Sequence, residues 1–190
     1  MIICGLDECG RGSLAGPLLA GAVVFLSPLQ EILSLLPAPL RDSKKLTKIQ
    51  RHKIYNIRDR LPIIYKTESI SVADINTHGI SWANKEIFLR LTDKIKADRY
   101  LVDGNIKFTE PNIESVIRGD SLHPEIMLAS VLAKVERDLL MSTLHLEYPL
   151  YHWAKNSGYG TAEHINSLKI HGVSPLHRLV FAKTALSNVH

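Results

Sequence analysis

The chain of 190 residues has little that would fix it covalently or hold it in a membrane. Its two cysteines, Cys4 and Cys9, lie five positions apart without a CxxC spacing. Neither a disulfide framework nor a cysteine metal site is predicted, and we expect a reduced, cytoplasmic protein with both thiols in its interior. The longest apolar run, residues 14–26, is broken by Pro17 and glycines and is too short to cross a bilayer. The chain opens without a secretion signal, so no membrane partner is predicted.

Other absences limit the kinds of metal site and of domain organisation that the sequence can have. The nine histidines are scattered and no HExxH is present, so nothing indicates zinc chemistry. No internal repeat, low-complexity tract or linker divides the sequence, and its length suits one domain. Because 45% of the residues are hydrophobic, a disordered chain is excluded. A net charge of +4 is compatible with a nucleic-acid partner but does not require one.

The pattern of apolar residues predicts alternating strands and helices. The predicted strands span residues 2–7, 18–26, 63–72, 99–103 and 113–117. The predicted helices span a short part of 28–40, then 47–60, 81–96, 124–146, 161–171 and the closing segment HRLVFAKTAL. This order favours an α/β fold with a mixed central sheet flanked by helices. We expect one domain over residues 1–190, in which residues from about 146 form a small C-terminal helical lobe.

Acidic residues follow three of the predicted strands. Asp7 and Glu8 close the first apolar run, Asp103 closes a later one, and Asp120 follows the run at 113–117. Taken singly, each acid beside a glycine is typical of a turn. Ligand sites in α/β sheets gather beyond the carboxyl ends of strands, so the coincidence of all three predicts one acidic site.

Clustered carboxylates repel one another unless a cation neutralises them. Oxygen ligands suit Mg²⁺ or Mn²⁺, and a pair of such ions clamps the attacking and leaving oxygens of a phosphoryl displacement. The acids therefore indicate phosphodiester hydrolysis. One geometric condition remains, because neighbouring strand residues point to opposite faces. Asp7 and Glu8 can share the site only if the strand ends or bends there, which the following GRG makes plausible.

Six motifs in order resemble those of type 2 ribonuclease H, or ribonuclease HII: DECGRGSLAGP, DSKKL, LVDGN, RGDS, AKVERD and SGYGT. The resemblance covers residues 3 to about 181. It implies a ribonuclease H-like fold. It also implies an endoribonuclease that cuts the RNA strand of RNA–DNA hybrids and cuts at single ribonucleotides embedded in duplex DNA.

The resemblance also implies roles for the acids and for the loop that follows them. The four family carboxylates that bind metal are matched by Asp7, Glu8, Asp103 and Asp120. The family's GRG loop, whose backbone reads the ribose 2′-hydroxyl, is matched by Gly10, Arg11 and Gly12. Glycines suit that task because no Cβ keeps the backbone away from a sugar. Standing alone, Arg11 would be read as a solvent-facing arginine in a turn.

Three further residues match substrate-binding positions of the family. Tyr159 matches the tyrosine that stacks on the sugar at the RNA–DNA junction, although a lone tyrosine is more often a core or loop residue. Lys44 and Lys45 match basic residues near the substrate phosphates, although a lone pair of lysines is usually solvated. Within AKVERD, Lys134, Arg137 and Asp138 match the pattern without a role that the residues themselves reveal. Asp138 could support the site or form a surface ion pair.

The combined reading is a Mg²⁺- or Mn²⁺-dependent endoribonuclease acting on RNA–DNA duplexes. It would cut on the 5′ side of a ribonucleotide by two-metal-ion catalysis and leave a 3′-hydroxyl and a 5′-phosphate. We expect a monomer, and without a QxxLxxFF tail no binding to a sliding clamp is predicted. The alternatives are another nuclease of the same fold, of type 3 or resolvase-like, and a non-catalytic binder of hybrid duplexes.

Overall fold

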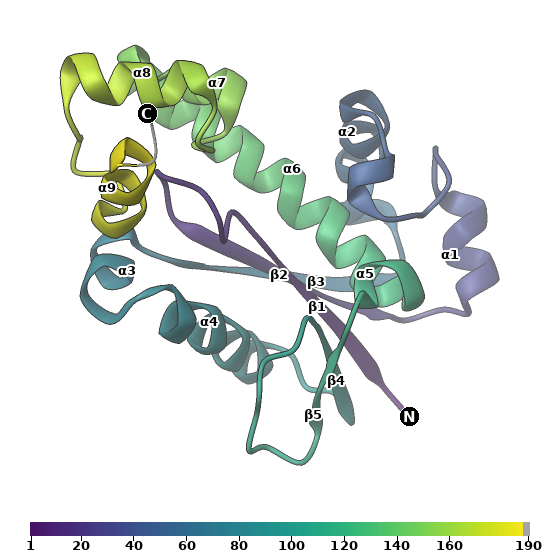
Figure 1. The fold of residues 1–190 in the computed structure, drawn as a ribbon. Coiled ribbons are helices and arrows are strands. Elements are labelled where there is room, and N and C mark those ends of the chain that lie inside the picture. The colour runs from purple at the N-terminus through teal and green to yellow at the C-terminus, as the bar shows by residue number, and fades with distance from the viewer. Residues whose placement is uncertain (188–190) are drawn as a thin grey trace. The chain divides into compact units, whose positions relative to one another are not determined.

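Five strands form a mixed sheet in the computed structural model, which describes residues 1–187 (Figure 1). The strands are β1 (Ile3–Cys9), β2 (Leu18–Phe25), β3 (Ile63–Ile70), β4 (Arg99–Asp103) and β5 (Ile113–Val116). Their order across the sheet is β3-β2-β1-β4-β5. β4 pairs in parallel with β1 on one side and with β5 on the other. The predicted α/β fold with a mixed central sheet is thereby confirmed.

The described residues also form nine α-helices. They are α1 (Leu29–Leu35), α2 (Lys48–Asn56), α3 (Val72–His78), α4 (Ile80–Lys94), α5 (Gly119–Leu122), α6 (Pro124–Glu147), α7 (Trp153–Asn156), α8 (Ala162–His171) and α9 (Leu179–Ser187). Short 3₁₀ turns occur at Ser43–Lys45, Arg58–Arg60 and Pro149–Tyr151. None of the described helices combines the length and the hydrophobicity that crossing a membrane requires.

Local signals explain where two of these helices begin. The predicted capping box of α2 is present: the Gln50 N–H donates to Thr47 Oγ1 at 3.2 Å, and the Thr47 N–H donates to Gln50 Oε1 at 2.9 Å. This helix ends at Asn56, before the predicted end, and a 3₁₀ turn continues to Arg60. Helix α3 begins where the predicted third strand was to end, because Ser71 accepts a hydrogen bond from the Asp74 N–H at 3.1 Å.

The chain divides into two units, each with its own core. Unit 1 comprises Met1–Cys9, Ala20–Glu68 and Lys85–Val135, and unit 2 comprises Gly10–Leu19, Ser69–Asn84 and the residues from Glu136 onward. Helices α4 and α6 contribute residues to both units. The single catalytic domain with a helical lobe from about residue 146 stays a prediction.

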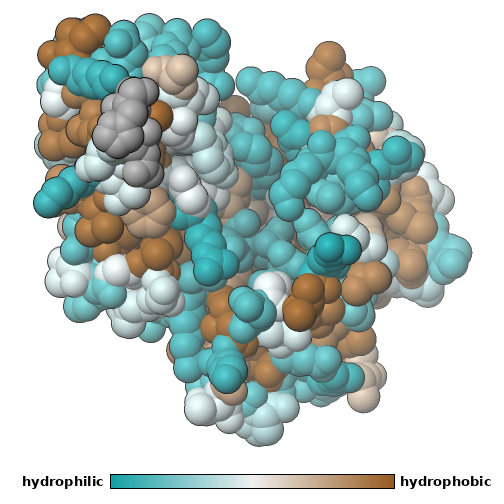
Figure 2. Space-filling view, in the orientation of Figure 1, coloured by the Kyte–Doolittle hydropathy of each residue, from teal (hydrophilic) through white to brown (hydrophobic). Residues whose placement is uncertain are grey.

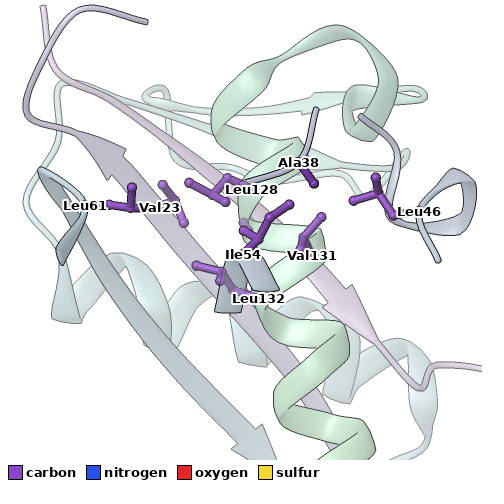
Figure 3. Packing of buried hydrophobic residues seen from close by; sticks show 9 residues of the cluster. Val23, Ala38, Leu46, Ile54, Leu61, Leu128, Val131 and Leu132 are labelled. Carbon is purple, nitrogen blue, oxygen red and sulfur yellow. The ribbon is translucent and has the colours of Figure 1, made fainter. Parts of the chain in front are cut away.

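In unit 1, α6 packs closely against one face of the sheet. A Cβ on Gly5 of β1 would lie 2.3 Å from the Ile126 backbone nitrogen, so only glycine permits this approach. Figure 1 shows the unit 1 part of α4 on the opposite side of the sheet. The core beside α6 includes Leu128 and Leu132, which point toward Val23 and Ile54 in Figure 3. This packing holds the strands that carry the acids.

The core of unit 2 is rich in aromatic rings. Its buried residues are Leu14, Ala15, Met141, Tyr151, Trp153, Leu168 and Ala182. Two histidines, His164 and His177, lie fully buried among them, with their Nε2 atoms 3.1 Å apart. The pair links helix α8 to the segment that precedes α9.

Hydrogen-bond partners fix the tautomer of each buried histidine. His164 Nδ1 lies 2.9 Å from the Tyr159 carbonyl, which can only accept, so Nδ1 carries the proton. His177 Nδ1 accepts from the Ser174 N–H at 2.8 Å, so its proton is on Nε2. His177 therefore donates to His164 Nε2, and both rings are satisfied as neutral groups.

Acid should destabilise the protein through this pair. Burial, followed by the neighbouring His164, lowers the pKa of His177 from 6.5 to about 4. Between these two pH values the His177 side chain is protonated in the unfolded chain but remains neutral in the folded protein. The free energy of unfolding should therefore fall by about 2–3 kcal/mol as the pH drops through this window. Urea denaturation at a series of pH values measures the change.

Two histidine variants serve as controls for that measurement. His177→Gln cannot titrate at this position and should make the fall in stability between pH 6.5 and 4 smaller, leaving the part due to His164, whose pKa burial also lowers. His171→Gln, at an exposed position on the end of α8, should leave it as in the wild type. A fall in stability as large in His177→Gln as in the wild type would contradict the assignment.

Candidate active site

Parallel strand pairing brings two of the predicted acids to one level of the sheet. Ile3 of β1 pairs with Arg99 of β4, and the register continues to Leu6 beside Val102. One further step along the same register places Asp7 opposite Asp103. The carboxyl ends of these two strands thus deliver their acids together, as the sequence predicts.

Asp120 reaches the same place by a different route from the predicted one. Strand β5 ends at Val116, so Asp120 does not close a strand. Arg118 takes a left-handed conformation with φ 58°, and the chain then enters the single turn of α5. There the Asp120 N–H donates to Asp103 Oδ1 at 3.3 Å. Asp120 follows β5, as expected, but it lies in a helical turn that the sequence did not predict, where its N–H contacts Asp103.

The charges of the cluster act on one another. Asp7 and Asp120 are each only 6% exposed. Burial, then the charge of Glu8, and then those of Asp103 and Asp120 hold the pKa of Asp7 well above its usual range. Burial also raises the pKa of Asp103, and the Asp120 charge adds to the effect. Bringing these carboxylates together therefore costs free energy that a cation would recover.

The strand does not bend between the two adjacent acids. β1 continues through Asp7 and Glu8 to Cys9, and the chain turns only at Gly10, where φ is 89°. The predicted bend is thus displaced to the residue after the strand. After burial, the charge of Glu8 is the largest cause that raises the pKa of Asp7, so the two neighbouring carboxylates interact.

Lys44 contributes a positive charge to the cluster. It lies in the 3₁₀ turn Ser43–Lys45, and its Nζ is 3.2 Å from Asp120 Oδ2. The turn is anchored by the buried hydroxyl of Ser43, 2.9 Å from that of Ser130 on α6. Lys45 is exposed. Figure 2 shows mainly hydrophilic residues over the following helix α2, whereas hydrophobic residues reach the surface over α1.

The cluster is chemically suited to a hard divalent cation. Its donors are carboxylate oxygens, which Mg²⁺ and Mn²⁺ prefer, and their mutual repulsion favours binding of positive charge. Among residues 1–187, no three acidic, histidine or cysteine side chains already converge as ligands of one ion.

The predicted ribose-reading loop and the predicted tyrosine both belong to unit 2. Gly10 is buried, and a Cβ there would lie 2.0 Å from Arg137 Nε. Arg11 and Gly12 are exposed, and a Cβ on Gly12 would meet no atom within 4 Å. Tyr159 is half-buried, and its ring centre lies 5.6 Å from Arg137 Cζ. Arg137 thus touches both candidate elements.

Arg137 is the residue of this region whose role the sequence left open. It is fully buried, and its guanidinium donates to the carbonyls of Pro17, Ala15 and Ser157 at 3.3, 3.1 and 2.7 Å. The next residue, Asp138, accepts a hydrogen bond from the Ser157 hydroxyl at 2.7 Å. The hydrogen-bond partners of Arg137 and Asp138 are all distant from them in the sequence. No local sequence pattern could therefore have revealed these contacts. Both residues support the loop that carries Tyr159.

Solved structures with a similar fold come from ribonucleases. Ribonuclease HII of Archaeoglobus fulgidus, in a complex with PCNA, superposes with a TM-score of 0.79 at 20% identity and covers 94% of both chains. Ribonuclease H2 of Pyrococcus horikoshii OT3 gives 0.76 at 23% identity over 98% of both chains. Bst-RNase HIII in complex with Mn²⁺ gives 0.72 at 16% identity, over 98% of this chain and 70% of that one. The architecture is that of a ribonuclease H-like protein.

Sequence relatives are more specific. The model of the ribonuclease HII family matches residues 4–184. Ribonuclease HII of Rickettsia bellii (strain OSU 85-389) is 41% identical over 184 residues, which are 96% of this chain and 90% of the relative. Ribonuclease HII of Acidovorax sp. (strain JS42) is also 41% identical, over 97% of this chain and 87% of the relative. The chain therefore belongs to the ribonuclease HII family, and it is a nuclease.

The repulsion within the acidic cluster predicts the effect of removing one charge. In EDTA at neutral pH, Asp7→Asn should raise the free energy of unfolding by about 1 kcal/mol, because a buried, repelled carboxylate is replaced by a neutral amide. The same variant should lose most of the stabilisation that added Mg²⁺ gives the wild type. Urea denaturation with and without Mg²⁺ measures both effects.

An exposed acid of unit 1 provides the control. Asp93→Asn on α4 should change neither the stability in EDTA nor the response to Mg²⁺. If Asp7→Asn keeps the full Mg²⁺ response, Asp7 does not hold the ion.

Proposed function

We propose that this protein is an endoribonuclease that hydrolyses the RNA strand of RNA–DNA hybrids and cuts duplex DNA on the 5′ side of an embedded ribonucleotide. The cut leaves a 3′-hydroxyl and a 5′-phosphate. The observation that carries the proposal is the acidic cluster at the ends of β1 and β4, in a chain of the ribonuclease HII family. Four acids facing a polyanion would only weaken a protein that binds without cleaving.

The proposed cofactor is Mg²⁺ or Mn²⁺, held by Asp7, Glu8, Asp103 and Asp120. When bound, two such ions activate water and neutralise charge that develops on the phosphate. The chain's own contribution is to hold the carboxylates in register, through the β1–β4 pairing and the α5 turn. Lys44, paired with Asp120, would balance negative charge near the phosphate, and Lys45 would contact the backbone of the substrate.

Recognition of the ribonucleotide is assigned to unit 2. Gly10, Arg11 and Gly12 would approach the sugar with their backbone, since the 2′-hydroxyl distinguishes RNA from DNA. Tyr159 would stack on the sugar at the junction. Its ring is half-buried beside Arg137, which limits the positions it can take.

A basic segment of unit 1 supports binding to a nucleic acid. Residues 41–60 contain eight lysines and arginines and two aspartates, whereas the whole chain has a net charge of +4. The charge excess of the protein is thus concentrated around the 3₁₀ turn of Lys44 and helix α2. Such a segment attracts phosphates without reading sequence.

The first test is cleavage of a labelled DNA duplex that contains one ribonucleotide. In Mg²⁺ the wild type should cut once, on the 5′ side of the ribonucleotide, and EDTA should stop the reaction. Asp103→Asn should lower kcat/KM by about 10³-fold, because a charge that positions the ions is lost. The amide oxygen of the substituted side chain can still accept the Asp120 N–H, so the fold should persist. Asp93→Asn is the matched control.

The other outcomes separate the remaining alternatives. Cleavage of a continuous hybrid without cleavage at a single ribonucleotide would favour a type 3-like or resolvase-like nuclease. Binding of both duplexes without metal-dependent turnover would favour a non-catalytic binder. Wild-type activity in Asp103→Asn would refute the assignment of the acids.

A second test uses two glycines of the loop that differ in their surroundings. Gly12→Ala should leave the free energy of unfolding within about 0.5 kcal/mol of the wild type, because the added Cβ enters open space. It should lower kcat/KM at a single ribonucleotide about tenfold, because the methyl group blocks the approach to the sugar. Cleavage kinetics together with urea denaturation measure both quantities.

Gly10→Ala, unlike Gly12→Ala, should destabilise the protein. Its φ of 89° and the contact with Arg137 predict a loss of about 2 kcal/mol in the free energy of unfolding. A Gly12→Ala variant with wild-type kcat/KM would show that the backbone does not approach the sugar at this position.

A further inference from the structure

Unit 2 buries two guanidinium groups, those of Arg137 and Arg178, and both residues are 0% exposed. Burying a cation costs several kcal/mol unless hydrogen bonds compensate for the lost water. An apolar side chain of similar volume would often stabilise the core as well or better. Arginines at these positions therefore call for a role that depends on their hydrogen bonds, and Arg178 has no role in the function proposed above.

The guanidinium of Arg178 donates hydrogen bonds to the loop that contains the GRG sequence. Its Nη1 donates to the carbonyls of Gly10 and Arg11 at 2.7 and 2.9 Å. Its Nε donates to the Gly16 carbonyl at 3.0 Å. One rigid, planar fork thus holds the loop at both of its ends.

This contact fixes the direction of two peptide groups. All described peptide bonds are trans, so each carbonyl points away from the N–H of the following residue. Since the carbonyls of Gly10 and Arg11 face Arg178, the N–H groups of Arg11 and Gly12 are directed away from it. Arg11 and Gly12 are both exposed residues.

Arg178 is itself held firmly in place. Its N–H donates to the Leu14 carbonyl at 2.8 Å. The side-chain amide of Asn76 on α3 binds the backbone on both sides of Arg178. Its Nδ2 donates to the His177 carbonyl at 3.1 Å, and its Oδ1 accepts from the Leu179 N–H at 2.8 Å. The residues on either side of Arg178 are thus bound to one amide group.

The same support extends to Tyr159. His177, which precedes Arg178, donates to His164, whose Nδ1 donates to the Tyr159 carbonyl at 2.9 Å. The loop expected to read the ribose and the tyrosine expected to stack on it are therefore joined through consecutive residues, His177 and Arg178.

We infer that Arg178 is a positioning residue for ribose recognition, whose guanidinium orients the amides of Arg11 and Gly12 toward the sugar that bears the 2′-hydroxyl. This inference rests on the function proposed above. Arg178 touches the loop and not the substrate, so its loss should impair the discrimination between ribose and deoxyribose. It should leave the general attraction to the duplex backbone unchanged, because that attraction arises elsewhere in the chain.

The test compares two DNA duplexes that differ only in one 2′-hydroxyl. Their affinities are measured by fluorescence anisotropy in EDTA, where hydrolysis is not expected. The wild type should prefer the duplex with the ribonucleotide. Arg178→Lys keeps the charge but cannot form the fork, and Arg178→Gln removes the charge. Both should lower the affinity ratio about tenfold and change the affinity for the all-DNA duplex less than about twofold.

A second pair of variants covers the case in which Arg178 variants do not fold. Asn76→Ala removes the two hydrogen bonds of the Asn76 amide and keeps the Arg178 guanidinium. It should lower the ratio of the two duplex affinities about threefold. Thr77→Ala, on the same helix, is the matched control: its hydroxyl donates to the Ala73 carbonyl within α3, so the ratio should be that of the wild type.

The outcomes distinguish the inference from the function on which it rests. A wild type without preference for the ribonucleotide would refute the proposed function. A wild type with that preference, together with unchanged ratios in the folded Arg178 variants or in Asn76→Ala, would overturn the inference alone. An equal loss of affinity for both duplexes would also overturn it, because Arg178 would then be purely structural.

Discussion

The parallel register between β1 and β4 is the constraint on which the acidic site depends. A shift of one residue would move Asp7 to the other face of the sheet relative to Asp103. The register is held from outside the strands, because α6 lies so close to Gly5 that no side chain fits between them. Close packing of an apolar helix therefore determines where the charges of the cluster lie.

The two units bury charges of opposite sign and use them differently. In unit 1, Asp7 and Asp120 are buried near other acids, so their repulsion stores free energy that a bound cation can release. In unit 2, Arg137 and Arg178 are buried among backbone carbonyls, which accept hydrogen bonds from their guanidinium groups. The first arrangement is suited to binding an ion, and the second to holding a loop rigid.

The sequence was most informative where the signal is local. Strand β4 ends at Asp103 as predicted, and the Thr47 capping box begins α2. Helix α3 was missed although Ser71 and Gly79 mark its two ends, because the apolar pattern before it was read as a continuing strand. The α5 turn that carries Asp120 was missed because four residues leave no periodic signal.

The supporting residues could not be predicted for a different reason. A buried arginine has the same local signature as an exposed one, and its burial depends on carbonyls that only the tertiary fold brings near it. Arg178 is 168 positions away from Gly10, whose carbonyl it contacts. Family motifs selected Asp7, Gly10 and Tyr159 as candidates, whereas the hydrogen bonds that position the loop became visible only in three dimensions.

The β1–β4 pairing also has a consequence for synthesis of the chain. Partners in this ladder are 96 positions apart, so β1 must leave the ribosome and wait until more than half of the protein has been made before its partner exists. Non-local pairing of this kind slows folding and prolongs exposure of apolar strands such as β2. It also keeps Asp7 and Asp103 far apart in the nascent chain, so their repulsion opposes folding only in its late stages.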